Sequence, residues 1–506
     1  MASPTSPPPA PDHRSTIASG AALGRWLATQ RWYSSPASGT RERDAQPFDA
    51  GDPDLLGRNG PTVDPPRTVA LGTEPPVAIG LVETPGGDRY QLLLGPGADA
   101  NPPAGELSPD QGSDPSSLAA LARFVAGGGE ASAVGVGTIV GHWLGDAEAL
   151  GDGPSRLLGA EQSNTSAVVG GHHVLKVLRR LQPGLHPELE IGRHLAATAP
   201  EPTLPVARLA GWYHLVPDGD DPSGGGGDPG ATTTLGVVQV LVPGALDGWA
   251  LVLSALAGDP AGLLVRLRDL GTATAVLHGA LARPAPGRRT SKGAREAPQA
   301  FGAVPLTPPR TDAVVSAVTA DAEQLLATTL DRPPALAAVV GRAAEVVSVA
   351  TALVRCAGED LGASIRHHGD LHLGQTVVGP DGWVFLDFEG EPTRSLDERR
   401  QRHSPLRDVA AMMRSFSYAA ANRRRSGGTR LSDGWERAAR AAYLDGYLAA
   451  VDPALLPASA AATARLLALF ELEKVVYEIR YELSHRPDWL SIPVEGLTRL
   501  LDTGAP

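Results

Sequence analysis

The sequence predicts an α+β fold of two lobes, in which β-rich segments come first and a mostly helical half follows. Up to about residue 245, short apolar runs are separated by turns rich in Gly and Pro, as in strands and hairpins. Beyond that point, apolar residues recur at helical spacing over most of the chain. One short hairpin with acidic residues on either side interrupts the helical half.

The expected elements follow one another in a simple order. A short amphipathic helix at 26–33 precedes strands at 68–71, 77–82 and 90–94, and a turn at 85–88 joins the last two. Further strands are expected within 155–180 and 235–242, and a helix opens at Pro187. The helical half is expected to contain helices at 248–258, 261–283, 311–328, 335–357, 405–422, 433–449 and 458–484. Tails or linkers are expected at 1–14, 96–115, 216–231 and 284–309.

Length and composition exclude several classes of protein. A chain of 506 residues suits two or three domains, and 42% hydrophobic residues suffice for real cores. The net charge of −12 argues against sequence-independent nucleic-acid binding. A single cysteine, Cys356, excludes an internal disulfide and a multi-cysteine metal site. The sequence shows neither a signal pattern nor an apolar run of membrane-spanning length, so we expect a cytoplasmic monomer without membrane or nucleic-acid partners.

The stretch 366–392 carries the most specific pattern. It reads His368-Gly-Asp-Leu-His-Leu-Gly-Gln375, then a strand pair turning at Gly379-Pro-Asp-Gly382, then Asp-Phe-Glu-Gly. Asp370 and Asp387 thus stand on either side of one hairpin. Phosphoryl transfer from ATP needs two such carboxylates, one to accept the proton of the attacking hydroxyl and one to hold Mg²⁺ on the phosphates. The alternative, two solvated loop acids, is disfavoured because an apolar strand leads directly into Asp387.

The β-rich half carries candidate phosphate-binding groups. A polar turn between strands can offer backbone N–H groups and hydroxyls to phosphate oxygens. Lys176 lies in the following apolar strand, where it would meet the α and β phosphates, although an exposed strand lysine is the alternative. The turn residues are Gln162, Ser163, Asn164 and Thr165.

Two further segments complete the expected nucleotide side. A carboxylate at the start of the helix that opens at Pro187 should hold Lys176, and we favour Glu190 slightly over Glu188. The strand through Gln239 would form the hinge whose backbone binds adenine. These residues, followed by the helical half with its hairpin, predict a two-lobed protein-kinase-like fold. We expect a disordered tail (1–14), a β-rich cap subdomain (15–115), a nucleotide-binding lobe (116–245) and a helical lobe (246–506).

The chain resembles the bacterial maltokinases, which are relatives of the aminoglycoside phosphotransferases. The resemblance implies phosphorylation of maltose by ATP to maltose 1-phosphate, which feeds α-1,4-glucan (glycogen-like) synthesis. It implies Asp370 as the base, Gln375 and Asp387 as Mg²⁺ ligands, and Lys176 as the phosphate-binding lysine. It rests on segments 159–166, 187–190, 247–249, 368–375, 387–392, 404–410, 414–420, 474–478 and 486–493.

Candidate acceptor residues cluster on the helix expected at 458–484. Tyr477 and Tyr481 share one face and could stack on sugar rings, while Glu478 and Glu482 share an adjoining face and could bind hydroxyls. The alternative is a surface helix with ordinary ion pairs, such as Lys474 with Glu478. The residues expected to contact the acceptor are His372, Glu389, Tyr477, Glu478 and Tyr481.

Two other functions remain open from the sequence. A kinase for glucosamine or an aminoglycoside-like amine would share this architecture, and extra carboxylates around the acceptor would favour it because an ammonium group needs anionic partners. A pseudokinase that only binds nucleotide is disfavoured because Lys176, Asp370, Gln375 and Asp387 are all present.

Overall fold

A computed structural model provides the fold, and within it the chain forms two compact units. Unit 1 comprises the chain up to His186 together with Leu209–Leu241, and unit 2 comprises Pro187–Arg208 together with the chain from Val242 onward. The described residues are 23–24, 27–28, 30, 33, 63–64, 66–95, 112, 114–159, 163–198, 204–218, 232–285, 300–326, 333–355, 361–392, 394–425 and 434–503.

Unit 1 is built from two antiparallel sheets and a helix, α2 (Pro115–Ala126). The four-stranded sheet has the order β1 (Arg67–Ala70), β2 (Ala78–Glu83), β3 (Arg89–Leu94) and β9 (Arg180–Leu181). The seven-stranded sheet has the order β4 (Glu130–Ala133), β5 (Gly137–Trp143), β10 (Leu209–Val216), β11 (Thr233–Val240), β8 (His173–Leu178), β7 (Asn164–Gly170) and β6 (Gly153–Leu158).

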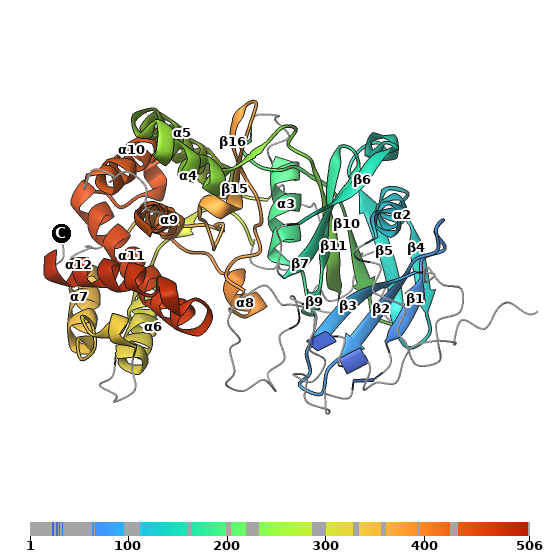
Figure 1. The fold of residues 1–506 in the computed structure, drawn as a ribbon, viewed down its shortest axis with the longest axis horizontal. Helices are drawn as coiled ribbons and strands as arrows, with labels where there is room; N and C mark the ends of the chain where they lie inside the picture. Colours follow the sequence, from blue (N-terminus) through green and yellow to red (C-terminus); the bar gives the residue numbers. More distant parts are fainter. Residues whose placement is uncertain are drawn as a thin grey trace, which may run out of the picture. The chain divides into compact units, whose positions relative to one another are not determined.

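Helix α2 covers one face of the seven-stranded sheet and closes the core of unit 1 (Figure 1). It starts at Pro115 because the Asp114 side chain caps it, accepting hydrogen bonds from the backbone N–H groups of Ser116 and Ser117. Its apolar side chains, such as Leu118 and Leu121, are fully buried among those of both sheets. The sequence pattern does not predict this helix, because the segment 96–115 that leads into it reads as a linker.

The two sheets of unit 1 are joined by a buried amide. The side chain of Gln91, on β3, donates hydrogen bonds to the carbonyls of Leu178 (2.9 Å) and Leu235 (2.8 Å) and accepts one from the Tyr213 hydroxyl (3.1 Å). Both N–H donors and the oxygen of this buried amide thus have partners across the interface of the sheets. The N-terminal strands therefore belong to the same folded unit as the larger sheet.

Unit 2 is mostly helical. Its helices are α3 (Pro187–Thr198), α4 (Gly248–Gly258), α5 (Pro260–Leu281), α6 (Pro308–Leu326), α7 (Ala343–Arg355), α8 (Leu396–Arg399), α9 (Leu406–Arg425), α10 (Trp435–Ala450), α11 (Ala460–His485) and α12 (Ser491–Thr503). Its strands are β12 (Leu246–Asp247), β13 (Val304–Pro305), β14 (Ala363–Ser364), β15 (Thr376–Gly379) and β16 (Gly382–Phe385). Strands β12, β15 and β16 form one small sheet, and β13 pairs with β14.

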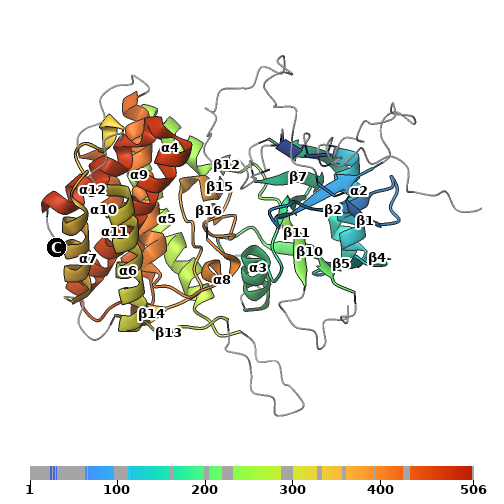
Figure 2. The same cartoon turned by 90° about the horizontal axis from the view of Figure 1, so that it is seen from below.

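The core of unit 2 lies among its long helices. Helix α10 packs along α5, α11 packs on α9, and α6 packs on α7 (Figure 2). Helix α3, which we expected with the strands of the nucleotide-binding lobe, packs in unit 2 and buries Ile191 and Leu195 in its core. Within the described residues, no helix is long and apolar enough to cross a membrane.

Most of the predicted helices in this half are confirmed, with ends that move by a few residues. The helix expected at 335–357 is shorter, since the α-helical part begins at Ala343. The expected helix at 26–33 and the tail at 1–14 lie largely or wholly outside the described residues.

Candidate functional site

The predicted hairpin forms and brings the loops at its two ends together. Strands β15 and β16 pair antiparallel from Thr376 opposite Phe385 to Gly379 opposite Gly382. Past the pairing, the Leu386 N–H donates to the Gln375 carbonyl (2.9 Å), and the Gln375 side-chain amide donates to Oδ2 of Asp387 (2.9 Å). The two residues predicted as Mg²⁺ ligands are therefore direct neighbours.

Asp387 has an unusual backbone. Its φ of 61° makes it the only non-glycine residue with a positive φ in the described part of the chain. Such strain persists at functional positions where the surrounding structure over-determines the backbone. A carboxylate and an amide oxygen side by side are the hard oxygen ligands that Mg²⁺ prefers, with water and phosphate oxygens completing its shell. The residues present thus fit a phosphate-bound Mg²⁺.

The loop before the hairpin is locked against the loop after it. A nitrogen of the His368 ring lies 2.9 Å from the Leu386 carbonyl, and the other ring nitrogen accepts a weak hydrogen bond from the Asp370 N–H (3.4 Å). Gly369 has a φ of +87°, and a Cβ there would lie 3.3 Å from Cα of Gly390. Only glycine combines that φ with so close a backbone approach. The spacing His-Gly-Asp therefore has a local steric reason.

Asp408, at the start of α9, clamps the same loop from behind. Its carboxylate accepts hydrogen bonds from the N–H groups of His368 (2.8 Å) and Gly369 (3.0 Å) and lies 3.1 Å from Nε2 of His278. Burial alone would raise the pKa of Asp408. The neighbouring histidines, among them His278 with its hydrogen bond, outweigh burial and hold the pKa well below its ordinary value. Asp408 remains ionised and stabilises the backbone that presents Asp370.

Asp370 is partly exposed, and its contacts define the rest of the site. Oδ1 of Asp370 accepts a hydrogen bond from Nζ of Lys474 on α11 (3.2 Å), and the same ammonium group donates to Glu391 (2.9 Å). Burial alone would lower the pKa of Lys474, but Glu391 and Asp370 outweigh it and raise the pKa above its ordinary value. The pKa of Glu391 is in turn held well below its ordinary value, because Lys474 and nearby arginines outweigh the effect of burial.

His372 lies beside Asp370 and has a structural contact. It caps the 3₁₀ turn η4 (Leu373–Gln375), and its Nδ1 accepts a hydrogen bond from the Gly374 N–H (3.0 Å). Burial lowers its pKa, so the ring is neutral near pH 7. The contact of His372 with the acceptor stays a prediction.

The predicted nucleotide residues of unit 1 lie on its larger sheet. Lys176, on β8, is opposite Ser166 and Val237 and is 4% exposed, so the alternative of an exposed strand lysine is wrong. Gln239 lies on β11. Asn164 and Thr165 are part of β7 rather than of a turn.

The side chains of these two residues serve the sheet itself. Oγ1 of Thr165 accepts a hydrogen bond from Nε of Arg179 (2.9 Å), and Oδ1 of Asn164 accepts one from the Arg179 N–H (3.4 Å). The predicted polar turn is therefore shorter than expected at this end. Ser163 is exposed, and Gln162 lies outside the described residues.

Glu190 has partners that the sequence did not suggest. It is almost fully buried on α3, and its carboxylate binds Arg366 (2.7 Å) and Arg400 (2.9 Å), both within unit 2. We correct the preference for Glu190 as the partner of Lys176, because two arginines already saturate this carboxylate. The preference failed because Arg366 and Arg400 lie about two hundred residues further along the chain.

The predicted acceptor residues on α11 divide into two groups. Tyr477 and Tyr481 are half-buried with ring centroids 6.3 Å apart, as the shared helical face predicts. Glu478 is buried, and its Oε2 accepts hydrogen bonds from Nε (3.0 Å) and Nη2 (2.8 Å) of Arg414, while its contact with the acceptor stays a prediction. The surface-helix alternative supposed that Lys474 pairs with Glu478. Lys474 binds Asp370 and Glu391 instead.

Two other acids near the site also have partners. Glu482 accepts hydrogen bonds from the Tyr418 hydroxyl (2.9 Å) and from Arg486 (2.7 Å). Glu389, the remaining predicted acceptor residue, is half-buried in the loop after β16, and its carbonyl accepts a hydrogen bond from Arg399 (3.0 Å). Its contact with the acceptor stays a prediction.

Sequence reasoning missed the roles of Lys474 and Glu391, and it missed the hydrogen bonds of Asp408 to the catalytic loop. The contacts of Lys474 with Asp370 and Glu391, and of Asp408 with Gly369, join residues between 39 and 104 positions apart in the sequence. No local periodicity reports such pairings.

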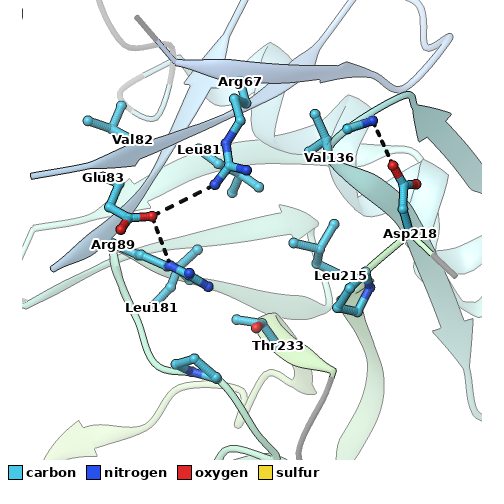
Figure 3. Close-up of a pocket in the computed structure, with 13 residues that line it drawn as sticks. Arg67, Leu81, Val82, Glu83, Arg89, Val136, Leu181, Leu215, Asp218 and Thr233 are labelled. Atoms are coloured by element: carbon cyan, nitrogen blue, oxygen red, sulfur yellow. Dashed lines mark hydrogen bonds and ion pairs between the residues drawn. The ribbon is translucent and has the colours of Figure 1, made fainter. Parts of the chain in front are cut away.

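A separate cavity of about 350 Å³ opens in unit 1 and contains none of the predicted site residues (Figure 3). Arg67 and Arg89 both approach Glu83 on its wall, and Asp218 accepts a hydrogen bond from the Gly135 N–H on the opposite side. These groups largely neutralise one another.

Comparisons with known proteins give a consistent result. No family model matches the chain. A glucosamine kinase of Streptacidiphilus jiangxiensis is 30% identical over 356 residues, which are 67% of this chain and 72% of that protein. A glucosamine kinase of Mycolicibacterium smegmatis is 28% identical over 380 residues, covering 69% of this chain and 80% of the relative.

Solved structures confirm the predicted fold class. A glucosamine kinase in complex with glucosamine, ADP and inorganic phosphate matches with a TM-score of 0.61 and 22% identity, over 89% of this chain and 97% of that chain. A glucosamine kinase in crystal form B matches with a TM-score of 0.60 and 22% identity, over 87% of this chain and 94% of that chain. The α+β, protein-kinase-like fold is therefore that of this chain, and its sequence identity to the Streptacidiphilus enzyme shows that it belongs to the glucosamine kinase family.

Proposed function

We propose that this protein transfers the γ-phosphoryl group of ATP to a hydroxyl of glucosamine. The observation that carries the proposal is the joined pair of loops around Asp370 and Asp387, in a chain of the glucosamine kinase family. Kinases of this fold use ATP and Mg²⁺, and the residues of unit 2 fit both requirements. We prefer glucosamine as the acceptor over maltose, which the sequence resemblance implied, because both relatives described above are glucosamine kinases.

Asp370 is proposed as the general base. One of its carboxylate oxygens is held by Lys474, and the other can accept the proton of the acceptor hydroxyl. As the O–H bond breaks, the acceptor oxygen forms a bond to the γ-phosphorus, and the bond from that phosphorus to the β–γ bridging oxygen breaks to release ADP. His368 and Asp408 keep the backbone of Asp370 in place during this step.

Gln375 and Asp387 are proposed to hold Mg²⁺, which when bound supplies positive charge to the phosphate oxygens. Lys176 is proposed to bind the α and β phosphates, which suits a buried lysine on a strand. Since Glu190 is taken by two arginines, Glu188 becomes the better candidate for the carboxylate that orients Lys176.

Maltose is the second candidate acceptor. The ring pair of Tyr477 and Tyr481 favours it, because two aromatic rings along a helix can stack on two sugar rings. However, the ammonium of Lys474 lies 4.6 Å from the Tyr477 ring, and the guanidinium of Arg486 lies 5.3 Å from the Tyr481 ring. Since both rings already pack against cations, we rank maltose second.

A panel assay tests the proposal. The full-length protein is incubated with ATP, Mg²⁺ and either glucosamine, maltose, glucose or kanamycin, and each product is identified by NMR. We expect glucosamine to have the highest kcat/KM and to carry the phosphate at its 6-position. The Asp370→Asn variant, purified in parallel, controls for contaminating kinases. An alkali-stable, acid-labile phosphate on maltose, formed faster than the glucosamine product, would overturn this choice of acceptor, and ATP binding without any transfer would indicate a binding module.

A further inference from the structure

We propose that Lys474 is a positioning residue for the catalytic base, and that Glu391 and a line of alternating charges hold its ammonium group in place. The proposal rests on the proposed function, since it assigns Asp370 the role of base. Nothing in the sequence pattern around Lys474 indicated this role. It emerges only from the contacts of its ammonium group.

The ammonium group contacts two carboxylates and one ring. Its distances are 3.2 Å to Oδ1 of Asp370, 2.9 Å to Oε1 of Glu391 and 4.6 Å to the Tyr477 ring centroid. The Lys474 side chain is 16% exposed, and that of Glu391 is 5% exposed. Within the described part of the chain, Oδ1 is the only oxygen of the Asp370 carboxylate that accepts a hydrogen bond. Lys474 thus orients the carboxylate and leaves Oδ2 for the proton of the acceptor.

Lys474 is itself held by a chain of ion pairs. The second oxygen of Glu391 accepts a hydrogen bond from Arg394 (2.5 Å), and Arg394 also lies 3.3 Å from Glu473. Glu473 binds Arg407 through two hydrogen bonds of 2.6 and 3.0 Å. Charges therefore alternate from Asp370 to Arg407, and each buried charge has a partner of opposite sign, as burial requires.

The chain of ion pairs ends at Arg407, next to the residue that binds the backbone of the catalytic loop. Arg407 is followed directly by Asp408, whose carboxylate binds the N–H groups of His368 and Gly369. The side chain and the backbone of Asp370 are thus held by groups that meet at the start of α9. A base held from both directions stays within the small positional tolerance that proton transfer demands.

Two simpler roles fit the contacts less well. A purely structural lysine would need only Glu391, yet the ammonium group reaches the residue that accepts the proton. A proton-transfer role would need a neutral amine near pH 7, whereas the two carboxylates raise the pKa of Lys474 above its ordinary value. The remaining role is to fix the orientation of Asp370.

The test compares three variants of the full-length protein. Lys474→Ala should lower kcat by about 10²-fold, while KM for ATP changes by less than about threefold, because the base is misplaced but nucleotide contacts remain. Lys474→Arg should recover part of kcat, since it restores the charge. Arg440→Met is the matched control. It breaks a partly buried ion pair between Arg440 on α10 and Glu471, which lies on α11 as Lys474 does, and it should lower the melting temperature with kcat unchanged.

Chemical rescue sharpens the comparison. The Lys474→Ala variant leaves space beside Asp370 and Glu391, so added propylammonium should raise its kcat in a saturable way. Propanol of equal size should not. Rescue by the amine alone supports a positional charge. Absence of rescue, together with an equal loss of kcat in Arg440→Met, would show that Lys474 acts only through stability and would overturn the proposal.

The two proposals can fail separately. All variants are measured with whichever acceptor the wild type phosphorylates, so a wrong choice of sugar leaves the comparison intact. If the wild type phosphorylates glucosamine but Lys474→Ala retains its full kcat, only the positioning role is refuted.

Discussion

Replacing Asp408 with Asn removes the backbone clamp of the catalytic loop with almost no change in shape. In the wild type, Oδ2 lies within hydrogen-bond distance of the His368 N–H and of His278, and Oδ1 accepts from the Gly369 N–H. An Asn oriented to keep the Oδ2 contacts turns its NH₂ group toward the Gly369 N–H. One buried donor then loses its acceptor, which costs about 1–3 kcal/mol, and the two remaining bonds lose charge assistance. We expect a total loss of about 3 kcal/mol.

Differential scanning calorimetry and steady-state kinetics measure the effect. A loss of this size should lower the melting temperature of the transition that includes unit 2 by about 5 °C. kcat should fall by about ten- to a hundredfold, since the backbone of Asp370 is no longer fixed. The control is Asp502→Asn, the same chemical change at an exposed carboxylate paired with Arg342, which should change stability by less than about 1 kcal/mol.

The pH dependence gives a second check on the same variant. Because the folded-state pKa of Asp408 lies below its ordinary value, its stabilisation is fully present at pH 7. As the pH falls below about 4, the unfolded state takes up a proton that the folded state does not, and this stabilisation declines. The difference in unfolding free energy between wild type and Asp408→Asn should therefore narrow at pH 3. An Asp408→Asn variant that matches Asp502→Asn in melting temperature and kcat would refute the clamp.

Three further outcomes are expected. Asp370→Asn should lower turnover at least about 10²-fold while nucleotide affinity, measured by calorimetric titration, stays near wild type, because an amide cannot accept the hydroxyl proton; near-full activity would remove it from the mechanism. Asp387→Ala should abolish Mg²⁺-dependent ATP binding and activity together, and normal Mg-ATP binding by this variant would refute the metal assignment. His367, whose pKa burial lowers to about 3 against the attraction of Asp408, stays neutral while the unfolded chain protonates below pH 6.5. Wild type should thus lose about 3 kcal/mol more stability than His367→Leu between pH 6.5 and 4 in guanidinium unfolding, and parallel losses in the two proteins would refute the assignment.

The sequence by itself determined the local parts of the site. Apolar strands separated by Gly379-Pro-Asp-Gly382 form the hairpin as predicted, because turn residues and short-range pairing decide it. The glycine of His-Gly-Asp is needed for a positive φ at a close backbone contact, which is also a local constraint. The long helices of unit 2 follow their apolar periodicity for the same reason. The acceptor, by contrast, is not decided by the sequence, since segments around a shared catalytic hairpin do not distinguish related sugar kinases.

Only the tertiary structure decided which charges meet. Glu190 and Glu478 both stand at plausible positions for binding a ligand, yet both carboxylates bind arginines of unit 2. Lys474 reaches Asp370 across 104 residues of sequence, and Asp408 reaches Gly369 across 39. A charge that leaves water must find an opposite charge or enough hydrogen bonds, and the packing of helices determines which partner is in reach. Residue type and spacing show that such groups exist, whereas their pairing depends on contacts that no local pattern encodes.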